Sequence, residues 1–334
     1  MPNYEKSGNV APWYTLRKQI NAIVVEEGIT GIGDYAFYNI ARATTIDVAD
    51  SVYHLGQFFI RDTGITEITL NTAKEVEPYA FGSTPNLKTI TFGEAVKNFK
   101  GNIFSTGEYS YTIKAPTDSY VDHYVRHYSE KYTTSAVQLT FESTGNATAP
   151  VQHFSFAGDN VFYVIYANSN SNWSVEVTGS TRMKNFPYIS TKYMGQLTPM
   201  YDIAEFTDNE RKIMTIKVYD GVSTLGNYAF YKCNKAATLI IPDDLTLIGA
   251  GSLWACAKIP SINVPETVTK IGKNAFNGCA NLVSVTIPDS VVEYGGNVFI
   301  KCNFKILTVY TNNEYVIECL RAEYGETINI QPLN

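Results

Sequence analysis

The segment INVPETVTKIGKNAFNGCANL, residues 262–282, is the clearest copy of a unit that recurs along the C-terminal half of the chain. In each copy an apolar residue stands three positions before a cysteine, and both recur every 23 residues. The apolar residues are Phe230, Leu253, Phe276 and Phe299, and the cysteines are Cys233, Cys256, Cys279 and Cys302. Self-similarity at a fixed period of this size indicates a solenoid or propeller, in which each unit repeats one structural coil.

The N-terminal half carries the same pattern at a similar period. Its ladder residues are Phe37, Phe59, Phe81 and Phe104, with spacings of 22, 22 and 23 residues. Every unit also has two apolar residues separated by one position. These pairs are Ile23/Val25, Ile46/Val48, Ile68/Leu70 and Ile90/Phe92 in the first half, and Ile216/Val218, Leu239/Ile241, Ile262/Val264, Val285/Ile287 and Leu307/Val309 in the second, where the last interval shortens to 22.

An apolar-x-apolar pair is typical of a short strand that directs two side chains to one face. The strand is followed by a proline or polar stop and then by a turn such as LGNYAF or IGKNAF. One such unit cannot bury its apolar face alone. Stacking units at the inter-strand spacing of about 4.8 Å aligns equivalent residues into ladders, so neighbouring coils bury each other.

A stacked array needs ends that cover its core, and both arrays have candidates. Segments 111–138 and 307–331 each read as strand, short helix, strand. Tyr120 and Tyr124 in the first segment, and Val316 and Leu320 in the second, have helical spacing. At the front, we expect Trp13 and Ile20 to close the first coil.

The unit Ile-Pro-x-x-Val-x-x-Ile-Gly-x-x-Ala-Phe-x-x-Cys-x-x-Leu resembles the BspA-like leucine-rich repeats of bacterial surface proteins. The resemblance covers roughly residues 11–138 and 213–334, and APWYTLRKQI at 11–20 resembles the family's N-terminal lead-in. The first array departs from the pattern, because Ile40, Asp62 and Thr84 stand where the second array has cysteine. The resemblance implies adhesion or partner binding at the cell surface, without naming a ligand.

Residues 139–212 lose the period and read as alternating strands, which favours an all-β sandwich. The stretch SNSNWSVEV resembles the BACON-like immunoglobulin-type domains of gut bacterial surface proteins, a family associated with carbohydrate or mucin binding. The usual second Trp of that family is absent. We therefore predict a mainly β protein with short helices and three domains: a leucine-rich-repeat array with its cap over 1–138, a BACON-like sandwich over 139–212, and a second capped array over 213–334.

Composition and charge limit the classes of partner and the location that the sequence supports. The formal charge is −6, and no cluster of Lys and Arg marks a nucleic-acid footprint. The sequence contains no run of 18 apolar residues, so it predicts no membrane span. The first residues also lack the apolar stretch of a signal peptide. The family resemblance nevertheless implies an extracellular or cell-surface location. Oligomeric state does not follow from the sequence.

Several motifs have a structural explanation that competes with a chemical one. The four cysteines lack the CxxC spacing of zinc sites, and parallel Cβ directions disfavour disulfides, so we expect buried free thiols. The fingerprint GxGxxA at 31–36 lacks a βαβ setting and is explained by the repeat. His123 and His127 have the spacing of a zinc pair but no third ligand, which favours solvent-facing histidines. We expect no catalytic residues, no metal and no cofactor.

The remaining candidate is the outward face of the strands. The side chains between the inward apolar positions are Asp47, Thr69, Thr91 and Thr112 in the first array and Lys217, Ile240, Asn263, Thr286 and Thr308 in the second. Such a surface suits a protein or glycan partner, although Thr also simply fits an exposed strand. Trp254 beside the cysteine ladder is a further contact candidate. Trp173 is either a sugar-stacking residue or a core residue of the sandwich.

Three functions stay open. The first is a non-catalytic surface adhesin that contacts a host or bacterial surface protein or glycan through its repeats. The second is carbohydrate or mucin binding through residues 139–212. The third is a structural subunit of a surface appendage or phage virion.

Overall fold

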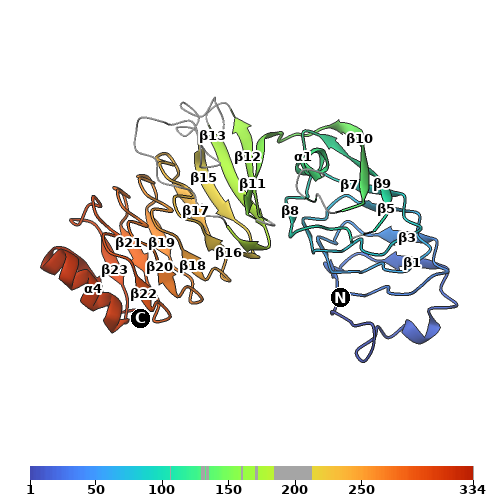
Figure 1. The fold of residues 1–334 in the computed structure, drawn as a ribbon, viewed down its shortest axis with the longest axis horizontal. Coiled ribbons are helices and arrows are strands. Elements are labelled where there is room, and N and C mark those ends of the chain that lie inside the picture. The colour runs from blue at the N-terminus through green and yellow to red at the C-terminus, as the bar shows by residue number, and fades with distance from the viewer. Residues whose placement is uncertain are drawn as a thin grey trace. The chain divides into compact units, whose positions relative to one another are not determined.

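The computed structural model describes residues 1–105, 107–128, 132, 135–158, 161–169, 172–183 and 213–333. These residues form two compact units, Met1–Gln152 and His153–Asn334, which we call unit 1 and unit 2. Each unit contains parallel strands stacked coil upon coil (Figure 1). The two predicted solenoids are therefore confirmed.

The predicted apolar-x-apolar pairs of unit 1 lie on four long strands, β1 (Ala22–Val25), β3 (Thr45–Val48), β5 (Glu67–Leu70) and β7 (Thr89–Phe92). Two further long strands are β9 (Ser110–Thr117) and β10 (Gln138–Asn146). β1 pairs with β3, and β5, β7, β9 and β10 form a second parallel sheet. Equivalent residues are register partners on adjacent strands: Ile23 pairs with Ile46, and Ile68 pairs with Ile90.

The first four coils of unit 1 also have a second, two-residue strand where the sequence predicts only a turn. In unit 1 these strands are β2 (Gly31–Ile32), β4 (His54–Leu55), β6 (Glu75–Val76) and β8 (Asn98–Phe99), which form a four-stranded parallel sheet. Ile32, Leu55, Val76 and Phe99 are completely buried in it. Each short strand contains only one buried apolar residue. Because a single residue shows no alternation, the sequence pattern could not indicate a strand there.

The cap of unit 1 has the predicted strand, helix, strand order. α1 (Tyr120–Arg126) begins at Ser119, whose hydroxyl accepts a hydrogen bond from the Asp122 N–H at 3.3 Å. Tyr120 and Tyr124 pack edge-on against Phe99. At the other end, the 3-10 turn η1 (Tyr14–Leu16) follows Trp13, whose ring lies 5.8 Å from that of Phe37.

The long strands of unit 2 form two sheets. One has the order β11 (Val151–Gly158), β12 (Val161–Ser169), β13 (Asn172–Gly179), β15 (Ile213–Val218), β17 (Thr238–Ile240), and the other the order β19 (Ser261–Asn263), β21 (Ser284–Thr286), β23 (Thr308–Tyr310), β24 (Asn329–Gln331). β12 and β13 are antiparallel, whereas β13 pairs in parallel with β15. The segment before the second array thus joins the array's own sheet.

The short strands of unit 2 form a five-stranded parallel sheet. They are β14 (Thr181–Arg182), β16 (Val222–Leu225), β18 (Leu247–Ile248), β20 (Lys270–Ile271) and β22 (Glu293–Tyr294). The predicted C-terminal cap is present as α4 (Glu314–Tyr324), followed by the 3-10 turn η2 (Gly325–Thr327) and β24. The Asn313 side chain caps α4 by accepting from the Val316 N–H at 3.1 Å.

The core of unit 2 contains the predicted ladders. Phe230, Leu253, Phe276 and Phe299 are fully buried, and the cysteines beside them are buried free thiols. Each later thiol donates to the carbonyl of the ladder residue one coil earlier: Cys256 to Phe230 at 3.2 Å, Cys279 to Leu253 at 3.4 Å and Cys302 to Phe276 at 3.3 Å. The prediction of free thiols is confirmed, and these contacts explain how the sulfur atoms are accommodated.

The described residues show no separate β-sandwich. β10, which begins at the predicted boundary, pairs with β9 of the first array, while β12 and β13 belong to a sheet of unit 2. Residues 184–212 of the predicted sandwich lie outside the described residues. The compact units divide after Gln152, and the three-domain division stays a prediction.

Candidate binding face

The outward side chains of the long strands form a mostly polar surface on each unit, which we call the strand face. In unit 1, Asp47 and Thr69 are exposed and Thr91 is half-buried. Thr69 and Thr91 are register partners on β5 and β7. The sequence therefore placed these three residues correctly on the outer surface.

In unit 2, Lys217 on β15 faces Ile240 on β17, and Asn263 on β19 faces Thr286 on β21. The Thr286 hydroxyl donates a hydrogen bond to the Asn263 side-chain carbonyl. The Lys217 ammonium lies 3.9 Å from the centre of the Tyr219 ring, so this cation is partly engaged by its own unit.

The predicted register is wrong at the last coil of each array. Thr112 lies opposite Thr89, and the residue that follows Thr91 in its row is Lys114. Likewise Thr308 lies opposite Ser284, because Val309 pairs with Val285 and the last interval lengthens to 24 instead of shortening to 22. Lys114 and Tyr310 are thus the members of the row that sequence reasoning missed.

Thr112 and Thr308 belong instead to a second outward row, two residues earlier on each strand. Its members are Thr45, Glu67, Thr89, Thr112 and Thr140 in unit 1, and Thr215, Thr238, Ser261, Ser284, Thr308 and Asn329 in unit 2. The Asn329 amide donates to the Thr308 hydroxyl at 2.9 Å. Strand alternation could have revealed this row, because the residue before each inward pair must also point outward.

The strand face of unit 1 carries more charge than that of unit 2. Glu27, Asp47, Asp50 and Glu67 line a shallow recess of about 440 Å³ across β3 and β5. Towards the cap, Lys114 and Glu142 form an exposed ion pair at 3.0 Å. No group of three His, Cys, Asp or Glu within the described part of the chain is arranged to hold a metal ion.

The two tryptophan candidates differ in their surroundings. Trp254 is half-buried, with its ring 5.4 Å from Tyr231 and 6.4 Å from Tyr228. Trp173 packs against the core of unit 2, which supports its interpretation as a core residue.

A surface aromatic ladder in unit 1 escaped the sequence reasoning. The rings of Tyr35 and Phe58 stack at 5.3 Å and those of Phe58 and Tyr79 at 5.8 Å. All three residues have positive φ, between 51° and 62°, a conformation that bulky residues rarely adopt. The Arg61 guanidinium lies 5.2 Å from the Phe58 ring. Backbone conformation, which the pattern does not encode, brings these rings together on the turns.

The motifs with a rival chemical interpretation lie in a repeat coil and in the cap helix. Gly31 begins the short strand β2, within a repeat coil. His123 and His127 stack with their rings 6.3 Å apart, but His123 is only 14% exposed, so the expectation that it faces solvent is wrong. Burial and the nearby Arg126 lower the pKa of His123. Its helix, α1, packs against β9 and β10, which the i, i+4 spacing could not show.

A charged network crosses the short strands of unit 1. The His54 imidazole lies 3.8 Å from Glu75 and 3.9 Å from Glu77, and the Lys100 ammonium lies 2.8 Å from Glu77. The contact with His54, reinforced by Lys100, lowers the pKa of Glu75. The residues come from different coils, so only the stacking reveals the network.

Together, the stacked parallel coils and their polar strand face define a leucine-rich-repeat solenoid protein. The sequence matches the family described as BspA type leucine rich repeat region, in six copies over residues 14–124 and 203–320. This match covers more than half of the chain, and the protein belongs to that family. Leucine-rich-repeat proteins are in general non-enzymatic binding proteins.

Solved structures with similarity to this chain include two bacterial leucine-rich proteins and a pneumococcal antigen. One from Bacteroides ovatus ATCC 8483 aligns over 95% of this chain and 85% of its own, at 14% identity and TM-score 0.36. A leucine rich cell surface protein from Faecalibacterium prausnitzii A2-165 aligns over 95% of this chain and 61% of its own, at 18% identity and TM-score 0.27. The pneumococcal vaccine antigen PcpA aligns over 94% and 79%, at 15% identity and TM-score 0.34. No curated protein matches the sequence. None of the helices that the structure describes has the length and apolarity needed to cross a membrane.

Proposed function

We propose that this protein is a non-catalytic adhesion or binding protein of the bacterial surface, and that it contacts a partner protein through its strand faces. The observation that carries the proposal is the pair of polar outward rows in unit 2. In the second outward row, hydroxyl and amide side chains are register partners within each sheet, as Thr215 on β15 is with Thr238 on β17, and as Ser261 on β19 is with its successors up to Asn329 on β24.

The chemistry of these rows suits recognition of a broad surface. Ser, Thr and Asn side chains both donate and accept hydrogen bonds, and neighbouring strands repeat them about every 4.8 Å. Solenoids present such extended faces to their partners. Ile240, which is 46% exposed, adds an apolar contact within the polar surroundings.

The test is a binding screen of the full chain against extracellular-matrix and bacterial surface proteins, followed by two variants. Thr238→Arg and Ser284→Arg place a bulky charge in the middle of the second outward row without touching the core. Thr269→Arg is the matched control, because Thr269 is exposed but precedes the short strand β20. We expect both strand-face variants to lose binding by at least about tenfold and the control to keep it. Equal binding by all three variants would refute the assignment of the face.

A second candidate is glycan binding, which two observations favour. The aromatic ladder of Tyr35, Phe58 and Tyr79 offers rings at the surface, and Tyr79 is 42% exposed. Aromatic rings are suited to contact with sugar rings because they combine an apolar face with low conformational freedom. A glycan array that responds to the wild type, and not to Tyr79→Ala, would support this function.

The second observation concerns residues 139–212, for which we retain the proposal of a BACON-like sandwich. On β12, Tyr163 and Ile165 join the core of unit 2, while Phe162 and Val164 on the opposite face are also buried. Burial of both faces is what a two-layer arrangement requires. Limited proteolysis that releases a folded fragment of about these residues would support the three-domain division, and a glycan array would then test that fragment for carbohydrate or mucin binding.

The proposed location is extracellular, in accord with family membership. Surface labelling of intact cells would test it. Electron micrographs showing the chain built into a filament or a phage particle would instead favour the structural-subunit alternative.

A further inference from the structure

The first long strand of unit 1 has an open edge. β1 pairs with β3 on one side and has no strand partner on the other among the described residues. The remaining array ends are each extended by an additional strand: β10 on β9, β13 on β15 and β24 on β23. An edge of this kind is a template for pairing with another chain.

Main-chain groups of β1 point towards the open side. The carbonyls of Asn21 and Val25 accept hydrogen bonds from the Thr44 and Ala49 N–H groups of the next coil, at 3.1 and 3.0 Å. Successive residues of a strand direct their main-chain groups to opposite edges. Val24 is an odd number of positions from both Asn21 and Val25, so its N–H and C=O point away from β3.

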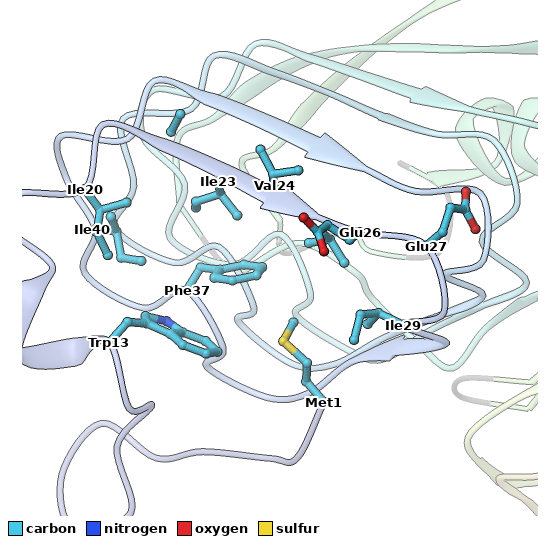
Figure 2. A pocket seen from close by; sticks show the side chains of 12 residues that line it. Met1, Trp13, Ile20, Ile23, Val24, Glu26, Glu27, Ile29, Phe37 and Ile40 are labelled. Atoms are coloured by element: carbon cyan, nitrogen blue, oxygen red, sulfur yellow. The ribbon is translucent and has the colours of Figure 1, made fainter.

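The N-terminal segment covers the short sheet but leaves β1 open. The Met1 amino group donates to the Gly31 carbonyl, and the Tyr4 N–H donates to Asp34 at 2.9 Å, so these residues lie along the edge of β2. An apolar cavity of about 520 Å³ remains below β1 (Figure 2). Its lining includes Trp13, Ile20, Ile23, Val25, Phe37 and Ile40.

The cavity has an acidic end. Glu26 and Glu27 directly follow β1 and are exposed, and Figure 2 shows Glu27 at one end of the group of lining side chains. Glu27 accepts a hydrogen bond from the Asp50 N–H at 3.2 Å and shares the neighbouring recess with Asp50 and Glu67. A chain that runs along β1 would therefore meet negative charge at its end.

We propose that this edge is a separate binding site for an extended peptide segment of a partner protein, with the pattern apolar-x-apolar followed by basic residues. The segment adds to β1 as a parallel strand, because every registered strand pair of unit 1 is parallel. Its apolar side chains continue the columns of Ile23 and Val25 into the cavity, and its basic residues lie beside Glu26 and Glu27. Main-chain hydrogen bonds supply affinity in such strand addition, and side-chain pockets supply specificity.

A second copy of the chain fits this edge poorly. Self-association through β1 would set one concave end against another, and two cavities cannot fill each other. Voids of this size are unfavourable in protein interiors and interfaces. The acidic end also requires a basic partner, which favours the peptide.

The test uses the full chain and the fluorescein-labelled peptide GSTVTVKKSG, with binding followed by fluorescence anisotropy. The variant Val24→Pro removes the outward N–H, and proline is tolerated where an edge strand faces solvent. Val24→Thr keeps the N–H and is the matched control, since the Val24 side chain is 66% exposed. We expect saturable binding by the wild type and by Val24→Thr, and about tenfold weaker binding by Val24→Pro at an unchanged melting temperature.

Peptide order and charge provide the second readout. GSKKVTVTSG, with the lysines first, and GSTVTVEESG, with glutamates, are expected to bind the wild type at least about tenfold more weakly. The double variant Glu26→Lys/Glu27→Lys is expected to prefer the glutamate peptide. Absence of binding to the wild type, equal binding by Val24→Pro, or a dimer in sedimentation that Val24→Pro dissociates would each overturn the proposal. None of these outcomes depends on the strand face of unit 2.

Discussion

Replacement of Phe276 by alanine is expected to destabilise unit 2 and to leave unit 1 unchanged. Phe276 is fully buried, with its ring 5.7 Å from that of Phe299 in the next coil. The Phe276 N–H donates to the Val298 carbonyl at 3.1 Å, and the Cys302 thiol donates to the Phe276 carbonyl at 3.3 Å. These hydrogen bonds hold the coils at a fixed spacing, so the cavity left by the ring cannot close.

Truncation of a buried Phe to Ala lowers the free energy of unfolding by about 3–5 kcal/mol. With a urea dependence of about 2 kcal/mol per molar, the midpoint of unit 2 should fall by about 1.5–2.5 M. The assay is tryptophan fluorescence in a Trp13→Phe background, because Trp173 and Trp254, both in unit 2, then give the signal.

Phe81→Ala is the reciprocal control. Phe81 is equally buried, but it lies in unit 1. We expect it to leave the unit 2 transition in place. A shift below about 0.3 M for Phe276→Ala, or an equal shift for both variants, would refute the view that each array is stabilised by contacts between its own neighbouring coils.

Three further outcomes follow from the titratable groups. Contact with His54 lowers the pKa of Glu75. The ionised Glu75 carboxylate therefore stabilises unit 1 above the ordinary Glu pKa, and this stabilisation is lost as the pH falls through the lowered value. Glu75→Gln should flatten the acid unfolding curve of unit 1. Burial raises the pKa of Tyr111 to about 12. The neutral Tyr111 side chain therefore makes its full contribution to stability below pH 10, and this contribution is lost as the pH rises towards 12. Tyrosinate absorbance of the wild type, compared with that of Tyr111→Phe, would measure this titration. Burial raises the pKa of the Cys302 thiol to about 11, so little of it is the reactive thiolate at pH 8. With Ellman's reagent at this pH we expect the half-buried Cys319 to react first. Rapid reaction of Cys302 in the folded protein would contradict its burial.

Repetition made the cores of both arrays predictable. Ladder residues such as Phe230 and Phe276 recur at a constant interval because every coil must place the same side chain at the same depth. The caps could be predicted for a related reason, since each breaks the period with a helical spacing. The sequence also identified the outward face, because alternation along a strand fixes which side chains point away from the core.

The parts that could not be predicted depend on contacts between coils. The His54, Glu75 and Lys100 network joins three different coils, and no short motif contains it. The stacked rings of Tyr35 and Phe58 require a positive φ at each residue, which hydrophobic periodicity does not report. Such features become visible only when the coils are placed at their actual spacing.

The misplaced residues at the array ends show the limit of the pattern most clearly. A shift of one residue along a strand would turn every apolar side chain outwards, so the sequence excludes it. A shift of two residues preserves both faces, and in the last coils the apolar positions permit either choice. The actual register is selected by the preceding turn, where the Thr112 N–H donates to Lys88 and the Thr308 N–H donates to Val283, both at 2.8 Å. Alternation therefore determines which side of the sheet a residue occupies, whereas turn length determines its neighbours, and a binding surface depends on both.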